Sequence, residues 1–181
     1  TDLRSMVGSG KKMEYSQAGP IVLQITEALT YLHDRGIIHL DLKPENIIIT
    51  PRNEVKIIDF GFASQERLPD LLAEDFYLPH GTPNYIAPEQ IAGHRREKRS
   101  DIYSVGILLY EMLIGRLPHP SSTRLSVTRR RLKVDPVPPR YYDQNIAPQL
   151  QEIILKCLER QPEKRYDSAS ALAWDLLNYQ D

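Results

Sequence analysis

The sequence predicts a mainly α domain, in which a helical bundle carries one small β-hairpin. Three observations predict it. Residues 21–35 have apolar side chains at helical spacing, residues 102–114 are almost continuously apolar, and two β-branched runs at 46–50 and 55–59 flank a polar turn. With 181 residues, 41% of them hydrophobic, the chain can bury a single core, and we expect one domain.

The first long helix is expected over residues 21–35. Its apolar residues recur every three or four positions, Pro20 favours the first helical turn, and Gly36 can end the helix in the left-handed conformation. The polar residues 1–20 are expected to form a weak helix followed by a loop.

The hairpin is the element that brings polar side chains together. Residues 46–50 and 55–59 are expected to pair through the turn at 51–54. Such pairing places Asn46 where one strand begins and Asp59 where the other ends. Both side chains can then face one metal ion.

The remainder of the chain is expected to be helical with long connections. Residues 62–86 show no periodicity and predict a long loop, which in a compact domain is usually functional. A buried helix is expected over residues 101–114, with Ser100 as its cap and Gly115 at its end. Two amphipathic helices are expected near the end of the chain, over residues 148–158 and 168–179, the second capped by Asp167 or Ser168.

Composition and charge argue against several classes of function. A net charge of −1 provides no overall field that would select nucleic acid or an anionic membrane. The basic run at residues 128–133 has no interleaved aromatic residues, so we expect a solvated helix face or a protein-docking surface, and no nucleic acid partner. The longest apolar stretch contains Glu111 and is too short for a membrane segment. Cys157, the one cysteine, lies among apolar residues and indicates a buried thiol in a reducing compartment.

The most informative motifs are His-Leu-Asp-Leu-Lys-Pro-Glu-Asn, residues 39–46, and a later Asp-Phe-Gly. In-line phosphoryl transfer to a hydroxyl needs a proton acceptor, a cation for the phosphate and oxygen ligands for Mg²⁺. Asp41 can accept the hydroxyl proton, and Lys43 can neutralise the γ-phosphate. Asn46 and Asp59 can hold Mg²⁺, because a neutral amide oxygen binds the ion without repelling phosphate while the carboxylate supplies charge.

Together with Gly-Thr-Pro-Asn-Tyr-Ile-Ala-Pro-Glu at residues 81–89, these motifs resemble a eukaryotic-like Ser/Thr protein kinase catalytic domain, from about the hinge onward. The resemblance covers nearly the whole chain. It implies a kinase-like C-terminal lobe over residues 1–181, with the catalytic loop at 39–46 and the activation segment at 59–89. It also implies ATP and Mg²⁺ as cofactors, a protein substrate with a Ser or Thr acceptor, and a cytoplasmic location.

The resemblance assigns further roles within the site. Thr82 would hydrogen-bond Asp41 and help to select Ser/Thr acceptors. Ile48 would form the apolar floor beneath the adenine ring, although an ordinary core residue is an equal interpretation. Structural support would come from His39 packing on Phe60, Glu89 paired with Arg165, and Asp101 accepting backbone N–H groups of the catalytic loop.

Leu40 departs from the pattern of the family. Most relatives have arginine there, which pairs with a phosphorylated residue of the activation segment, and leucine cannot make such a charge-assisted pair. Residues 62–80 contain Ser64 as their only serine or threonine, plus Tyr77. We therefore hypothesise that phosphorylation of this loop is not the switch that activates the protein.

Two classes of function compete for this sequence. The glycine-rich loop and the strand lysine that grip ATP belong to the N-terminal lobe, and neither is found before residue 20, so we expect that lobe to be absent from the given chain and to complete the site in cis. Retention of all four polar residues favours an enzyme. The absent lobe favours a non-catalytic docking or scaffold module, and the match at 81–89 argues against an unrelated metal-dependent phosphotransfer enzyme. We expect the isolated 181 residues to show little or no kinase activity.

Overall fold

A computed structural model describes residues 1–8, 10–69, 84–119 and 124–179, and it is mainly α with two short β ladders. In chain order the elements are η1 (Leu3–Ser5), α1 (Tyr15–His33), β1 (Ile37–Ile38), η2 (Pro44–Asn46), β2 (Ile47–Ile49), β3 (Val55–Ile57), β4 (Ser64–Gln65), α2 (Pro88–Ile91), α3 (Arg99–Ile114), α4 (Arg124–Lys133), α5 (Pro139–Tyr142), α6 (Pro148–Cys157), η3 (Pro162–Lys164) and α7 (Ala169–Asn178).

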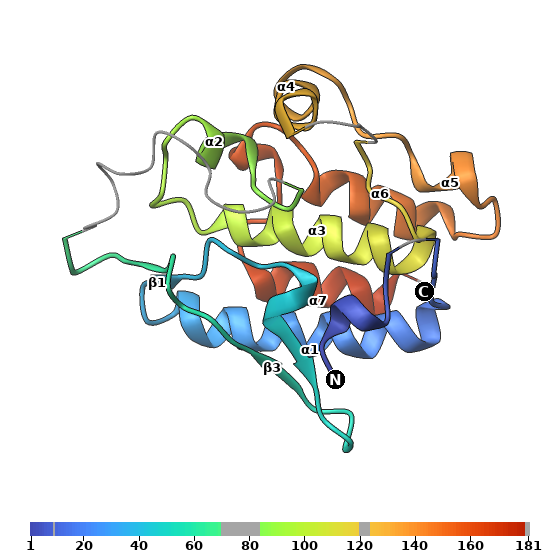
Figure 1. Ribbon diagram of the computed structural model, residues 1–181, viewed down its shortest axis with the longest axis horizontal. Helices are drawn as coiled ribbons and strands as arrows, with labels where there is room; N and C mark the ends of the chain where they lie inside the picture. Colours follow the sequence, from blue (N-terminus) through green and yellow to red (C-terminus); the bar gives the residue numbers. More distant parts are fainter. Residues whose placement is uncertain (9, 70–83, 120–123, 180–181) are drawn as a thin grey trace.

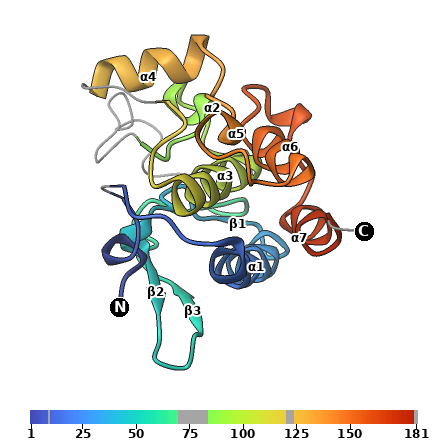
Figure 2. The ribbon, with the colours of Figure 1, turned by 90° about the vertical axis from the view of Figure 1, so that its right-hand side faces the viewer.

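Helix α3 is the centre of the molecule. It runs through the middle of Figure 1, with α4 above it and α1 below, and Figure 2 views it nearly end-on among the other helices. Nearly all of its side chains are buried, which confirms the buried helix that the apolar stretch predicted. Each large apolar side chain buried in this way contributes about 1.5–3 kcal/mol relative to an exposed one.

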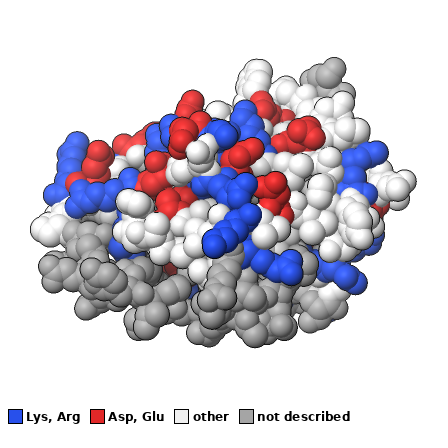
Figure 3. Space-filling model, turned by 90° about the horizontal axis from the view of Figure 1, so that it is seen from above, with Lys and Arg blue, Asp and Glu red and all other residues white. Residues whose placement is uncertain are grey.

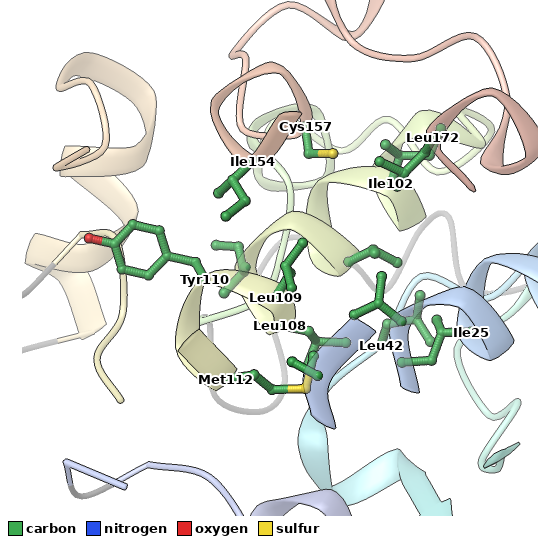
Figure 4. Packing of buried hydrophobic residues seen from close by; sticks show 14 of the residues in the cluster. Ile25, Leu42, Ile102, Leu108, Leu109, Tyr110, Met112, Ile154, Cys157 and Leu172 are labelled. Atoms are coloured by element: carbon green, nitrogen blue, oxygen red, sulfur yellow. The ribbon is translucent and has the colours of Figure 1, made fainter. Parts of the chain in front are cut away.

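The core is one cluster that joins α1, α3, α6 and α7 (Figure 4). Ile25 of α1, Leu108 of α3, Ile154 of α6 and Leu172 of α7 are all buried in it. This cluster gives the hairpin and the loop at 39–46 a rigid base, because Leu42 and Ile47 are buried in it as well. Among the helices in the described ranges, none combines the length and apolarity that a bilayer crossing requires.

Helix α3 packs closely against the C-terminal end of α6 at Gly106. A Cβ placed on Gly106 would lie 2.6 Å from the Cβ of Cys157 and 3.2 Å from Cδ2 of Leu158. Cys157 is buried at this contact, and burial raises the pKa of its thiol to about 12, as expected for an unreactive cysteine. The glycine is therefore needed for close packing of two helices.

Replacing Gly106 with alanine should destabilise the protein by about 1–3 kcal/mol, because the added methyl group overpacks the α3–α6 contact. Alanine normally stabilises a helix relative to glycine by about 1 kcal/mol, so the sign of the change is diagnostic. Urea unfolding of the wild type and of Gly106→Ala measures it. An unchanged or higher free energy of unfolding would contradict the close contact.

The predicted hairpin is present and is tied to α1. Strands β2 and β3 pair antiparallel, with Ile48 opposite Lys56. The side chain of Gln24 on α1 accepts a hydrogen bond from Val55 N at 2.9 Å and donates one to Asn53 O at 3.0 Å. These bonds orient the hairpin against the helix, and thereby the segments at either end of it.

The start of the first helix was predicted wrongly. Helix α1 begins at Tyr15, and Pro20 lies inside it and not in its first turn. Ala18 and Gly19 are buried and extend the apolar stripe toward the N-terminus. Pro20 leaves the carbonyl group of Ser16, four residues earlier, without an N–H partner, and both residues are exposed to water.

Two further expectations need correction, and two are confirmed. Ser100 is not the cap of α3 but lies within its first turn, where Glu97 accepts the Arg99 N–H at 3.0 Å. The loop expected over residues 62–86 contains strand β4, which pairs antiparallel with β1, and residues 70–83 lie outside the described part. Gly115 does end α3 in the left-handed conformation, and Ser168 does cap α7.

Candidate active site

Three of the predicted site residues meet in the loop between β1 and β2. Lys43 Nζ donates to Asp41 Oδ2 at 2.7 Å. The Asn46 amide nitrogen donates to the same oxygen at 3.1 Å and to the main-chain oxygen of Asp41 at 2.8 Å. The Asp41 carboxylate, the Lys43 ammonium group and the Asn46 amide therefore contact one another at the half-buried surface of the loop.

The local sequence explains why the loop turns this way. Pro44 begins the 3₁₀ turn η2, where its fixed φ suits the first position, and Asn46 N donates to Lys43 O at 2.9 Å. Pro44 and Asn46 are buried, so the turn is anchored from beneath. Lys43 and Asn46 are thereby brought back toward Asp41.

The backbone of the loop is held by Asp101 of α3, which is fully buried. Its two carboxylate oxygens accept the N–H groups of His39 at 2.9 Å and Leu40 at 2.8 Å, and His33 Nε2 lies 2.8 Å from Oδ2. Leu40 has φ of +65°, which costs a residue with a side chain on the order of 1–3 kcal/mol. Gln90 also donates to Leu40 O at 2.9 Å, so the strained turn is bonded on both sides.

Asp59 lies next to this loop because of the hairpin. Ile58 N donates to Asn46 O at 2.9 Å, which places Asp59 one residue beyond the residue bonded to Asn46. The backbone of Asp59 is left-handed, with φ of +62°, and its Oδ1 accepts the Gly61 N–H at 3.1 Å. Its carboxylate is exposed, and in the part of the chain that the structure describes no ion pair neutralises it.

The ring contact expected between His39 and Phe60 is present. Their centroids lie 4.9 Å apart with an interplanar angle of 63°, an edge-to-face arrangement. His39 Nε2 also lies 3.1 Å from Ile58 O. His39 therefore joins the loop at 39–46 to the Asp-Phe-Gly turn.

The donor atoms around the loop fit Mg²⁺. Since the Asn46 amide nitrogen is engaged with Asp41, a cation would meet its carbonyl oxygen, and Asp59 offers an exposed carboxylate. Both are the hard oxygen ligands that Mg²⁺ prefers. Two protein ligands suffice for an ion that takes its remaining ligands from phosphate and water.

The predicted roles of Ile48 and Thr82 are not tested by any contact among the described residues. Ile48 lies half-buried on β2, where it forms a bridge with Asp2 of the N-terminal segment. That position is compatible with both interpretations of this residue. Thr82 lies outside the described residues, as does Tyr77.

Glu89 and Arg165 form the predicted ion pair. Two nitrogens of the Arg165 guanidinium donate to the two Glu89 carboxylate oxygens at 2.6 and 2.7 Å, and Ser100 Oγ donates to Glu89 at 2.6 Å. The Arg165 side chain is fully buried. The pair fastens α2 to α3 and to the segment that precedes α7.

Ser64 is 3% exposed and lies on β4, and within the described residues its hydroxyl oxygen has no hydrogen-bond partner. In the full-length protein, Ser64→Ala should change turnover by less than about twofold, because a buried unpartnered hydroxyl adds nothing to folding. Steady-state assays and mass spectrometry of the purified protein would test this. Stoichiometric phosphate on Ser64 with a tenfold loss in the alanine variant would refute it.

Sequence reasoning missed a network around Glu111. Arg4 Nη1 donates to Glu111 Oε1 at 3.0 Å, and the Tyr85 hydroxyl donates to Oε2 at 2.5 Å. Arg4 also donates to the Tyr85 hydroxyl and to Glu45 of the loop at 39–46. Burial and the neighbouring Glu111 carboxylate raise the pKa of Tyr85. A carboxylate inside an apolar stretch was the available signal, because a buried charge requires partners.

The fold and the site together define a class of protein. A helical lobe whose Asp-Lys-Asn loop lies against an Asp-Phe-Gly turn combines motifs of a protein kinase catalytic domain. The family described as protein kinase domain matches residues 1–177 of the chain. The chain therefore belongs to the protein kinase family.

Curated relatives of the chain include proteins named serine/threonine-protein kinases. The chain is 37% identical to the serine/threonine-protein kinase PknB of Mycobacterium leprae over 175 residues, which are 97% of this chain and 28% of that protein. It is 34% identical to a probable serine/threonine-protein kinase of Clostridium acetobutylicum over 176 residues, 97% of this chain and 26% of the relative. The chain spans about a quarter of the length of these relatives.

Proposed function

We propose that this chain is the C-terminal lobe of a serine/threonine protein kinase, which transfers the γ-phosphoryl group of ATP to hydroxyl groups of protein substrates. The supporting observation is the cluster in which Lys43 and Asn46 both donate to Asp41 beside the Asp59 turn. Residues 39–46 are then the catalytic loop and residues 59–89 the activation segment. An N-terminal lobe in cis supplies the remaining contacts to ATP.

In this mechanism Asp41 accepts the proton of the acceptor hydroxyl. Lys43 and Asn46 both contact Oδ2, so Oδ1 is the carboxylate oxygen that an incoming hydroxyl can reach. The hydroxyl oxygen forms a bond to the γ-phosphorus, and the bond from that phosphorus to the β,γ-bridging oxygen breaks. ADP leaves, and the hydroxyl proton passes to Asp41.

The neighbouring residues hold the phosphates and the loop. Lys43 presents its ammonium group next to the proton acceptor, where it can offset the charge of the γ-phosphate. Asn46 and Asp59 would hold Mg²⁺, which when bound neutralises charge on the phosphates. Asp101 positions the loop through the His39 and Leu40 N–H groups.

Three expectations from the sequence complete the proposal. Thr82, which lies outside the described residues, would help to select Ser/Thr acceptors, and Ile48 would contact the adenine ring from below. His39 and Phe60 support the metal-binding turn through their ring contact. A donor such as ATP and a buried unreactive cysteine suit a cytoplasmic location.

The test is phosphoryl transfer by the full-length protein that contains this chain. With labelled ATP and Mg²⁺, peptides that carry Ser or Thr should be labelled, the matched Tyr peptide should not, and chelation of Mg²⁺ should abolish labelling. The coding sequence ahead of residue 1 should contain a glycine-rich loop and a strand lysine. A folded full-length protein that labels none of these peptides would favour the non-catalytic docking module.

A further inference from the structure

One arginine of the basic run at 128–133 does not lie on a solvated surface. Arg131 of α4 is 1% exposed, whereas Arg130 and Lys133 are exposed. Burial lowers the pKa of its guanidinium group.

The view from the α4 side shows basic and acidic side chains interspersed (Figure 3), so this face is not uniformly basic. The expectation of a solvated helix face is therefore wrong for Arg131.

Arg131 is directed at the backbone of residues 84–86, which lie just before α2. Its Nη2 donates to the main-chain oxygen of Asn84 at 2.6 Å, and its Nη1 donates to that of Ile86. Both acceptors are carbonyl groups of one short segment, two residues apart. A guanidinium can reach both because its donors diverge in a rigid plane, which a lysine ammonium on a flexible stem does not reproduce.

A second arginine holds the other end of the same segment. Arg165 pairs with Glu89, three residues after Ile86. The Tyr103 ring of α3, which is fully buried, is shared by both arginines, since Arg131 lies 5.7 Å and Arg165 4.9 Å from its centroid. Residues 84–89 are thus held near both ends by arginines that lie over one aromatic ring.

We propose that Arg131 is a positioning residue for the peptide substrate, which holds residues 84–86 in the conformation that receives the acceptor peptide. The proposal rests on the proposed function, in which these residues end the activation segment. Within the described residues, no hydrogen bond or ion pair joins Arg131 to Asp41, Lys43 or Asn46. Its loss should therefore weaken peptide binding and leave the chemical step nearly intact.

The experiment uses the full-length kinase and four variants. Arg131→Met retains an apolar stem and removes the donors, Arg131→Lys retains the charge, and Arg130→Met is the exposed neighbour on the same helix. Leu150→Ala weakens the core at α6 and serves as a variant of matched thermal stability. The readouts are KM for peptide, KM for ATP, kcat, and hydrogen exchange of residues 84–91.

Arg131→Met should raise KM for the peptide about tenfold or more, because two charge-assisted hydrogen bonds are lost. The values of kcat and of KM for ATP should change by less than about twofold. Hydrogen exchange of residues 84–91 should accelerate, Arg131→Lys should be intermediate, and Arg130→Met should match the wild type.

If Arg131→Met folds, either of two results would overturn the proposal. One is an unchanged peptide KM in Arg131→Met, and the other is an equal rise in Leu150→Ala at the same loss of thermal stability. If the wild type transfers no phosphate, the proposed function fails, and the exchange comparison still decides whether Arg131 orders residues 84–86. If Arg131→Met does not fold, Arg131→Lys with unchanged exchange and unchanged KM overturns it.

Discussion

Replacing Asp41 with asparagine in the full-length kinase should lower kcat by about 10²–10⁴-fold, the usual contribution of a positioned proton acceptor. Asparagine has the shape of aspartate but cannot take the hydroxyl proton. It also removes the charged acceptor that Lys43 and Asn46 share at 2.7 and 3.1 Å. The affinity for ATP should change little, because the carboxylate acts on the acceptor hydroxyl.

Steady-state turnover and nucleotide titration measure the two quantities separately. Glu54→Gln is the matched control, since Glu54 is an exposed acid in the hairpin turn and its neutralisation should leave kcat unchanged. Thermal unfolding of both variants shows whether each remains folded. A folded Asp41→Asn variant with wild-type turnover would remove Asp41 from the mechanism.

The second large effect is expected on stability. Arg165→Met should lower the free energy of unfolding by about 3–5 kcal/mol, because it leaves the Glu89 carboxylate buried without its cation. Both partners are nearly inaccessible to solvent, so screening by water offers little relief. Chemical denaturation of the chain measures the change.

A double-mutant cycle identifies the cause of the loss. Combining Arg165→Met with Glu89→Gln removes the uncompensated charge, so the double variant should be more stable than Arg165→Met alone. The exposed pair of Arg99 and Asp167 is the control, since Asp167 has a side chain 83% exposed and Asp167→Asn should cost no more than about 1 kcal/mol. Equal costs for Arg165→Met and Asp167→Asn would contradict the assignment of a buried ion pair.

Local patterns predicted most of the elements that position the site. The hairpin, the buried helix over 101–114 and the cap at Ser168 follow from residues that interact within one or two turns of chain. The first helix was misjudged at Pro20, because proline is common in a first turn and the burial of the preceding residues depends on their neighbours in space. The same reason explains Ser100, whose hydroxyl bonds Glu89 of α2 and not the end of its own helix.

The sequence by itself identified the candidate site residues of the loop, because Asp41, Lys43 and Asn46 lie within six positions and one turn brings them together. Only the tertiary structure decided which side chains hold that loop and the segment before α2. Asp101 reaches the loop across 61 positions, and Arg131 reaches Asn84 across 47. Contacts over such separations depend on how helices pack, and a buried polar group takes the partner that packing provides.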